Sequence, residues 1–221
     1  MAQNHFRNSR FWVDKGWALG VVLSSRGGGH TRGAVLSSRL AALPKEICLE
    51  YYGVESVGKP QDYEHKAEVV TLFEKIEAIA DSLGLCTFST IIWAPAPHAI
   101  FLGDLIDLLS ASIDFRGNGQ ELLGIGERIV NLEKGFNILH KGWSRRDDYP
   151  PARFVDESVS GGGSLEGECL VLEKWDRMLD KYYQLHGWDL QTSWPTRKRL
   201  LELGLTDVID RLEREGKDLS G

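Results

Sequence analysis

The sequence of 221 residues predicts an all-α, multihelical fold, in which long loops join the helices of a single irregular domain. Three observations point to this class. Apolar residues recur at three- and four-residue spacing through most of the chain, which is typical of helices with one buried face. A glycine follows nearly every such stretch, and the ambiguous Leu19–Leu23 is the main run that alternates instead. The composition, 42% hydrophobic and 26% charged, is that of a globular chain long enough to bury a core.

Helices are predicted over residues 35–52, 62–83, 98–111, 120–140, 170–186, 195–203 and 206–215. The segment 62–83 has the clearest pattern, because its apolar residues form a wide stripe with charged residues between them. Pro44 interrupts the first segment and is expected to break or kink it.

The ends of these helices are predicted from glycine, proline and threonine. A left-handed glycine is expected just after six of the helices, at Gly53, Gly84, Gly142, Gly187, Gly204 and Gly216. Pro195 is expected in a first turn and Thr206 at an N-cap. Gly119, Gly124 and Gly126 fall within an apolar period, which favours helix-start and helix-contact positions over a phosphate loop.

Two segments lack any regular pattern. Residues 26–33 contain three consecutive glycines, which maximise backbone entropy and exclude regular structure. Residues 144–168 are predicted to form a long loop on the surface of one domain that spans residues 1–221. The sequence offers no structural assignment for residues 1–16.

Charge and cysteine content exclude several classes of protein. The net charge of −6, without a basic cluster, disfavours nucleic acid as a partner. The least charged stretch, residues 86–103, is too interrupted by prolines and hydroxyl residues for a membrane span, and a cytoplasmic protein is expected. Three scattered cysteines suit a reducing compartment, and they are too few to hold a [4Fe–4S] cluster alone.

The residues alone leave the chemistry open. His30 ends the glycine-rich stretch, and a flexible surface turn is about as good an interpretation as a binding loop. Asp81 lies in the last turn of a predicted helix, where the dipole disfavours a carboxylate by roughly 0.3–1 kcal/mol and a compensating donor is expected. Cys86 follows directly, although a solvated aspartate beside a core cysteine is the simpler interpretation of that pair.

The remaining histidines and cysteines are weaker candidates. Cys48 and Cys169 are interpreted as packing residues, and His98 as either a ligand or a polar group at a helix start. His140 and His186 lie in predicted last helical turns, where a partly cationic imidazole suits the dipole.

Four stretches, taken in order, carry a family resemblance. They are Ser24-Ser-Arg-Gly-Gly-Gly-His-Thr-Arg32, Asp81-Ser-Leu-Gly-Leu-Cys86, the run from Gly124 through Gly-Glu-Arg and Asn-Leu-Glu to Asn137, and Leu179 to Asp189 with Pro195-Thr196 and Leu203-Gly-Leu205. Together they resemble the C-terminal part of the tungsten-dependent aldehyde:ferredoxin oxidoreductase family, from Trp17 to Leu212.

The resemblance implies a cofactor site shared with a second portion of the enzyme. Family members hold a tungsten (or molybdenum) bis-pyranopterin beside a [4Fe–4S] cluster and pass electrons from a small aldehyde to a ferredoxin-type carrier. By resemblance, Cys86 is the fourth cluster thiolate, Asp81 accepts hydrogen bonds from a pterin, and Leu85 presents backbone to it. His30 lies near the metal, and Arg32 faces the phosphate side of the cofactor.

Departures from the family pattern limit what this chain does alone. The N-terminal cofactor-binding portion and its Cys-x-x-Cys-x-x-x-Cys run are missing, and Gly29 stands where the family has cysteine. The isolated chain is therefore expected to be inactive, as a truncated domain or a separate subunit. Two alternatives stay open: a related tungsten enzyme that reduces carboxylates or aromatic thioesters, and a non-catalytic helical interaction module.

Overall fold

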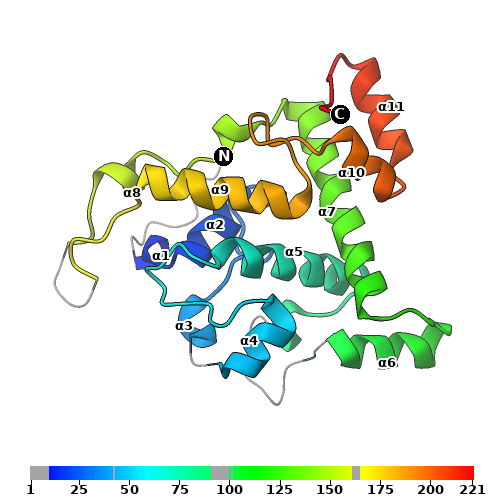
Figure 1. Ribbon diagram of the computed structural model, residues 1–221, viewed down its shortest axis with the longest axis horizontal. Coiled ribbons are helices and arrows are strands. Elements are labelled where there is room, and N and C mark those ends of the chain that lie inside the picture. Colours follow the sequence, from blue (N-terminus) through cyan, green and yellow to red (C-terminus); the bar gives the residue numbers. More distant parts are fainter. Residues whose placement is uncertain (1–9, 42, 91–99, 101, 161–164) are drawn as a thin grey trace.

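The computed structural model describes residues 10–41, 43–90, 100, 102–160 and 165–221 (Figure 1). The α-helices are α1 (Arg10–Val13), α2 (Lys15–Leu23), α3 (Ser37–Leu40), α4 (Lys45–Tyr52), α5 (Lys66–Ser82), α6 (Leu102–Ile113), α7 (Gly119–Lys141), α8 (Arg153–Asp156), α9 (Leu172–His186), α10 (Arg197–Glu202) and α11 (Thr206–Arg214). Two short 3-10 helices are η2 (Thr87–Ser89) and η3 (Arg145–Asp147). Within the described ranges, β-structure is confined to two isolated bridges. The predicted all-α class is confirmed.

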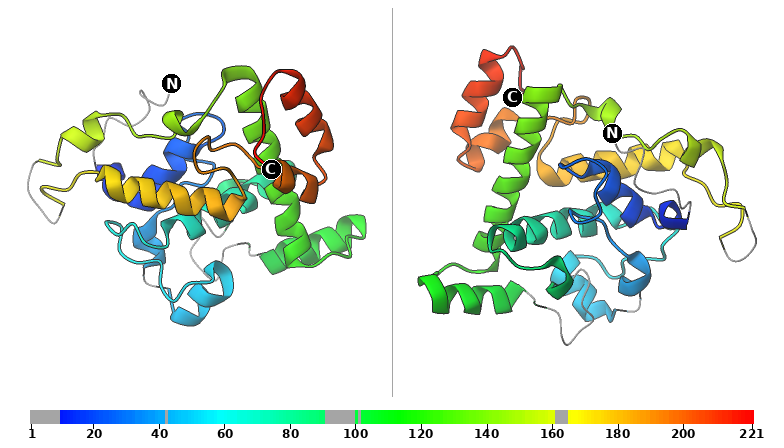
Figure 2. Two further views of the ribbon diagram at one scale, coloured as in Figure 1. Left: turned by 45° about the horizontal axis from the view of Figure 1, so that its top comes forward. Right: turned by 180° about the vertical axis from the view of Figure 1, so that it is seen from behind.

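Helix α5 is the centre of the fold. It contacts α2, α7 and α9, and Figures 1 and 2 show α9 alongside it and α7 crossing its end. Its predicted apolar stripe is buried, with Val69, Val70 and Phe73 fully inaccessible. Three acidic or polar side chains of the same helix, Thr71, Glu74 and Glu77, are buried as well.

The predicted helices of the first half form with shorter bounds. Pro44 separates α3 from α4 and stands directly before the first residue of α4, so the expected break occurs there. The predicted segment 62–83 becomes α5 from Lys66, and His65 precedes it with φ of 61°. The predicted segment 98–111 becomes α6 from Leu102, and His98 lies outside the described residues.

Helix α7 begins with a complete capping box. The Asn118 side chain accepts hydrogen bonds from the backbone of Gln120 and Glu121, and the Glu121 side chain accepts one from the Asn118 backbone. The six glycines predicted to end helices all have positive φ, between 60° and 69°. Those helix ends are therefore confirmed.

Two predicted helix starts are wrong by one or two residues. Pro195, expected in the first turn, lies two residues before Arg197, where α10 begins, and Thr196 is the N-cap, whose hydroxyl accepts a hydrogen bond from the Arg199 amide. Leu205 holds the N-cap position of α11, and Thr206 is the first helical residue. Proline and threonine each mark a helix start, but their exact position depends on the chain that enters it.

The sequence pattern missed α1 and α2. In α2 every residue from Lys15 to Val22 is buried, so the helix has no polar face and the period gives no signal. The ambiguous stretch Leu19–Leu23 is helical. Asp14 caps α2, since its carboxylate accepts hydrogen bonds from the amides of Gly16 and Trp17, at 3.1 and 3.2 Å.

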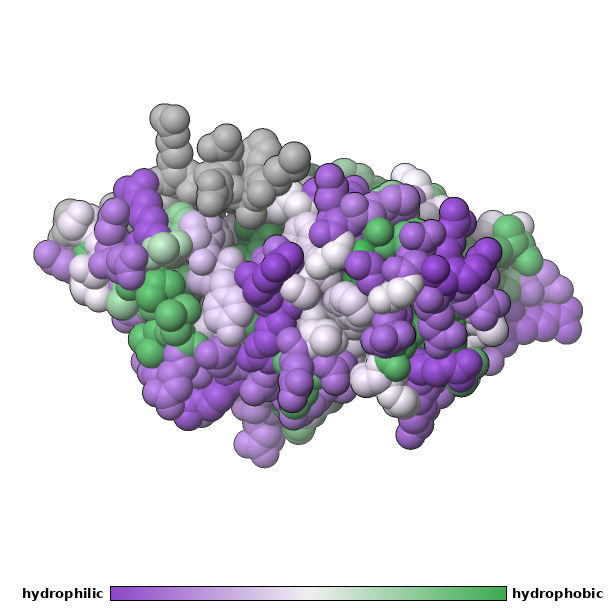
Figure 3. Space-filling model, turned by 90° about the horizontal axis from the view of Figure 1, so that it is seen from above, coloured by the Kyte–Doolittle hydropathy of each residue, from purple (hydrophilic) through white to green (hydrophobic). Residues whose placement is uncertain are grey.

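The segment 144–168 is mostly irregular and contains only η3 and α8 among its described residues. Its beginning lies against α9, where Arg145 forms ion pairs with Asp176 and Asp180, and α8 lies at one end of the molecule in Figures 1 and 2. Seen from above in Figure 3, the face of the molecule that carries α9 is largely hydrophilic, with small and separate apolar patches.

Candidate functional site

The glycine-rich stretch is a turn that follows α2. Gly27, Gly28 and Gly33 have φ of 77°, 57° and 87°, so the predicted irregular backbone is confirmed. A Cβ at Gly33 would lie 2.5 Å from Glu74 Cγ, and that residue therefore lets the turn approach α5 closely. At Gly29 a Cβ would have only Ser24 Oγ within 4 Å, at 3.6 Å. A Cβ therefore fits at this position without displacing a neighbour.

His30 lies half-buried at the end of this turn. Its ring stacks on Trp17 of α2 with centroids 5.5 Å apart and an interplanar angle of 18°. Because Trp17 is itself buried, the stack fixes the imidazole against a rigid helix.

Helix α5 ends as predicted. The Leu85 amide donates to the Ala80 carbonyl at 2.9 Å and the Gly84 amide to the Asp81 carbonyl at 3.2 Å, which is the Schellman pattern with Gly84 at φ of 69°. Leu85 then packs on the apolar cluster that contains Ile79. Cys86 follows this anchored residue and is exposed.

Two guanidinium groups from the glycine-rich turn compensate the carboxylate of Asp81. Oδ2 of Asp81 lies 3.3 Å from Arg32 Nη2 and 3.5 Å from Arg26 Nη2. The donor that the position of Asp81 requires is therefore supplied within the chain. The Asp81 side chain nevertheless stays 39% exposed, so the carboxylate remains open to a further partner.

Arg32 is the buried member of this group. Its side chain is 6% exposed, and Nη2 also lies 2.6 Å from Glu133 Oε1. Its Nε and Nη1 are buried without a hydrogen-bond partner among the described residues. A buried guanidinium with two unused donor atoms suits an acceptor-rich neighbour.

Glu133 of α7 is a site residue that sequence reasoning missed. Besides Arg32, it accepts a hydrogen bond from Ser25 Oγ at 2.6 Å, and Asn137, one turn on, donates to the Ser25 carbonyl at 2.7 Å. In the sequence Glu133 reads as one surface charge among many on a helix. Its place within the third family stretch was the available signal.

The fourth family stretch lies behind the turn. Trp188 Nε1 donates to Asn131 of α7 at 2.8 Å, and the Tyr182 hydroxyl donates to Glu74 at 2.7 Å. Burial raises the pKa of Glu74 to about 8. His186 Nε2 lies 3.3 Å from the Glu74 carboxyl.

His186 corrects one expectation. Its side chain is fully buried between aromatic rings, and burial lowers the pKa of the imidazole to about 3. The ring is therefore neutral rather than partly cationic, because desolvation outweighs the helix dipole.

A small cavity, lined by apolar as well as polar side chains, lies between these elements. Its free space for water centres is about 20 Å³, room for about one water. The polar side chains around it include Ser24, Arg32, Glu74, Glu133 and Lys134.

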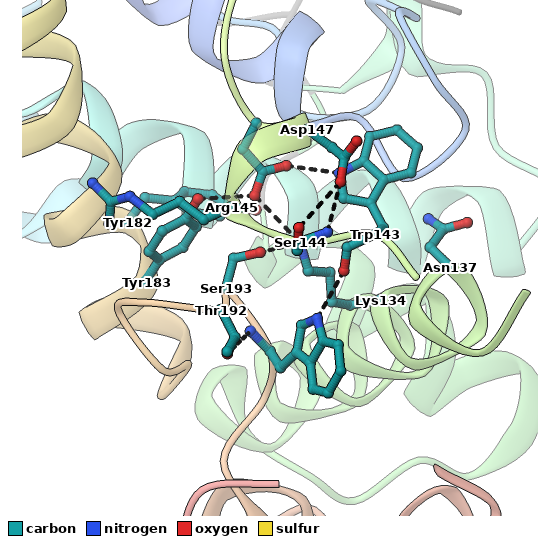
Figure 4. Close-up of polar contacts among 12 residues, drawn as sticks. Lys134, Asn137, Trp143, Ser144, Arg145, Asp147, Tyr182, Tyr183, Thr192 and Ser193 are labelled. Atoms are coloured by element: carbon teal, nitrogen blue, oxygen red, sulfur yellow. Dashed lines mark hydrogen bonds and ion pairs between the residues drawn. The ribbon is translucent and has the colours of Figure 1, made fainter. Parts of the chain in front are cut away.

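Lys134 connects this cavity with a second polar network, shown in Figure 4. Its Nζ lies 3.0 Å from Ser193 Oγ and 3.4 Å from Asp148, which also accepts hydrogen bonds from Trp143 and Tyr183. The network ties α7 and α9 to the segment that follows α7.

The cysteines differ in exposure. Cys48 is buried as predicted, Cys169 is partly exposed, and Cys86 is exposed. Within the described ranges no group of three or more His, Cys, Asp or Glu side chains is placed to hold a metal ion. The same ranges contain no helix long and apolar enough to cross a membrane.

Of the predicted site residues, the structure brings Arg32 and Asp81 into contact, and Leu85 and Cys86 follow Asp81 on one helix end. His30 lies in the same turn as Arg32, on Trp17. The four family stretches therefore meet, although they are far apart in sequence.

Known proteins of two kinds resemble this chain. The tungsten-containing aldehyde ferredoxin oxidoreductases of Pyrococcus furiosus and Pyrococcus horikoshii are each 30% identical to it, over 87% and 88% of the chain. The chain spans only 28% of the length of each of these relatives. A solved structure, the active site complex BamBC of benzoyl coenzyme A reductase in complex with 1,5 dienoyl-CoA, matches with a TM-score of 0.59 and 23% identity. It covers 75% of this chain and 23% of that one, and it supports the fold.

The match to a protein family covers a similar part of the chain. Residues 9–205 match the family described as aldehyde ferredoxin oxidoreductase, domains 2 & 3. The match covers most of the chain, and the curated relatives are oxidoreductases. This chain is therefore a member of the family of aldehyde ferredoxin oxidoreductase domains 2 and 3.

Proposed function

We propose that this chain forms one wall of a tungstopterin site in an enzyme that oxidises small aldehydes to carboxylic acids and passes the electrons to a ferredoxin-type carrier. The observation that carries the proposal is the contact of Arg32 with Asp81 and Glu133, which joins three family stretches at one place. The opposite wall comes from an N-terminal portion, as a domain or a subunit. The chain acts as one folded domain in the cytoplasm.

The chemistry of the side chains fits such a cofactor. Asp81 keeps a partly exposed carboxylate that accepts pterin N–H groups, and Leu85 follows at the same helix end, with its amide bonded to the Ala80 carbonyl. The positive charge of Arg32 beside Asp81 suits the phosphate side of the cofactor. Cys86 has an exposed thiol, as a ligand to a cluster held mainly by another portion requires.

A tungstopterin and a [4Fe–4S] cluster, when bound, would supply the two-electron redox chemistry and the path for electrons. The part of this chain is to orient and to exclude water. His30, held on Trp17, offers a ring nitrogen that donates a hydrogen bond to a substrate oxygen or takes up a proton there. Because both walls are required, the chain is inactive alone.

A second candidate function uses the same cofactor for the opposite reaction, the reduction of carboxylates or aromatic thioesters. The fold likeness to a benzoyl coenzyme A reductase complex is the observation that favours it. Assays of the assembled enzyme with an aldehyde and an artificial electron acceptor, and with a thioester and a reductant, separate the two. A non-catalytic interaction module would bind neither iron nor tungsten.

The test is reconstitution. The chain is co-expressed with an N-terminal portion that carries the Cys-x-x-Cys-x-x-x-Cys run, and iron and tungsten are measured in the purified complex. Cys86→Ala is expected to lower iron and cluster absorbance, while Cys169→Ala, a matched change of a partly exposed cysteine, leaves both intact. Undiminished iron in the Cys86→Ala complex would contradict the ligand role.

A further inference from the structure

Glu77 is a buried carboxyl on α5 that the proposed site does not yet use. Its side chain is buried, and burial raises the pKa of its carboxyl. A nonpolar side chain would fill the same space without the cost of desolvating a carboxyl. The hydrogen bonds of the Glu77 carboxyl must therefore offset the cost of its burial.

Those contacts are with the turn that follows Cys86. Oε1 of Glu77 accepts a hydrogen bond from Thr87 Oγ1 at 2.7 Å and lies 3.1 Å from Thr90 Oγ1, which is closer, at 2.7 Å, to the Thr87 carbonyl. Thr87 is the first residue of η2, and Thr90 is the residue that ends it. One carboxyl oxygen thus contacts both ends of this short helix and bonds most closely to its first residue.

The same turn is closed on the carbonyl of Cys86. The Ser89 amide donates to that carbonyl at 2.9 Å, and the Ser89 hydroxyl lies 2.6 Å from it. Cys86 is therefore fixed from two sides, by the Schellman end of α5 before it and by η2 after it. Exposed cysteines in unsupported loops have no such restraint.

Glu77 also lies one helical turn before Asp81. Residues four apart project from the same helix face, so one face of α5 carries both the carboxylate that pairs with Arg32 and the anchor of the Cys86 turn. We propose that Glu77 is a positioning residue, which sets the Cys86 thiol relative to Asp81 by binding Thr87 and Thr90. The value of this placement for a cluster ligand rests on the function proposed above.

The test uses the full chain without any cofactor. In a Cys169→Ala background, a nitroxide spin label is attached to Cys86, while Cys48 is buried and stays unlabelled. Three changes are compared: Glu77→Leu, Glu77→Gln, and the pair Thr87→Val with Thr90→Val. The control chain carries Cys86→Ala and the label on Cys169, which follows Glu168 in the segment before α9.

Glu77→Leu and the valine pair are expected to increase the mobile fraction of the label at Cys86 and leave the label at Cys169 unchanged. Glu77→Gln retains an acceptor oxygen and is expected to keep the rigid spectrum. Hydrogen exchange of the Ser89 and Thr90 amides should follow the same order, with about a tenfold increase for the loss of the bonds, while the Leu85 amide stays protected.

Three results would overturn the proposal: an unchanged label spectrum in Glu77→Leu, equal loosening in Glu77→Gln, or equal loosening at Cys169. If Glu77→Leu does not fold, Thr87→Val alone keeps the test decisive, because it removes the bond to Glu77 and leaves the Thr90 hydroxyl on the Thr87 carbonyl. These measurements need no metal, so they are independent of the iron content that tests the ligand role of Cys86. In the reconstituted complex, Glu77→Leu should retain less iron than Glu77→Gln.

Discussion

Two glycines of α7 give a matched pair of substitutions that tests the packing of the two main helices. A Cβ at Gly126 would lie 2.9 Å from the carbonyl carbon and 3.0 Å from the Cα of Lys75, in the backbone of α5. At Gly124 a Cβ would meet nothing within 4 Å. Both positions are inside the same helix, so each alanine gains about 1 kcal/mol of helix propensity.

The two variants are expected to differ in stability because only Gly126 contacts the α5 backbone. Gly124→Ala should stabilise the chain by about 1 kcal/mol. Gly126→Ala forces the α5 backbone to shift, at a cost of about 1–3 kcal/mol that offsets the same gain. The gap between the two variants is therefore about 1–3 kcal/mol, or roughly 2–12 °C in melting temperature for a chain of this size.

The measurement is urea and thermal unfolding followed by far-ultraviolet circular dichroism, with the denaturation midpoints compared between the variants. A Gly126→Ala chain as stable as Gly124→Ala would refute the close approach of α7 to α5. It would also remove the reason for Gly126 as a helix-contact residue.

Three further outcomes are expected. Burial in the folded state raises the pKa of Glu74 from 4.5 to about 8, so the protonated carboxyl contributes its full stabilisation below pH 4.5 and this contribution is lost as the pH rises toward 8. Glu74→Gln should make the urea midpoint fall less steeply with rising pH. An unchanged slope of midpoint against pH would contradict the raised pKa. Glu133→Gln keeps an acceptor oxygen but removes the charge, so that the buried Arg32 has only the half-exposed Asp81 as an ion-pair partner among the contacts described, and the free energy of unfolding should fall by about 1–2 kcal/mol; a midpoint equal to wild type would show that the charge of Glu133 contributes nothing. Asn118→Ala removes the α7 cap and should cost about 1 kcal/mol in the same assay, whereas an unshifted midpoint would mean that the cap is dispensable.

The sequence predicted the helices that have one exposed polar face and one buried apolar face. The stripe of the segment 62–83 became α5, and the glycines after the helices have the expected left-handed backbone. It failed at α2, which is buried on all sides and therefore has no period to detect. Of the three glycines in α7, Gly119 starts the helix and Gly126 is a contact, whereas Gly124 meets no neighbour.

The candidate site was predictable only in part. The helix dipole disfavours a carboxylate in the last turn, which indicated that Asp81 needs a hydrogen-bond donor. The chain supplies Arg32 and Arg26 as donors. No local pattern reveals which distant residues meet, so Glu133 and Glu77 looked like ordinary helix-surface charges. Their burial or half-burial depends on tertiary packing, which helical periodicity does not encode.

Helix α7 approaches two neighbouring helices closely, each time at a glycine. Gly126 lies against α5, and Gly135 lies against Val208 of α11, where a Cβ would be 2.7 Å from the valine Cγ1. Nine positions separate the two glycines, and Glu133 stands between them. One inserted residue in that interval would turn one glycine by about 100° relative to the other. Length polymorphism in this family should therefore be absent between these two positions, even where the flanking loops vary freely.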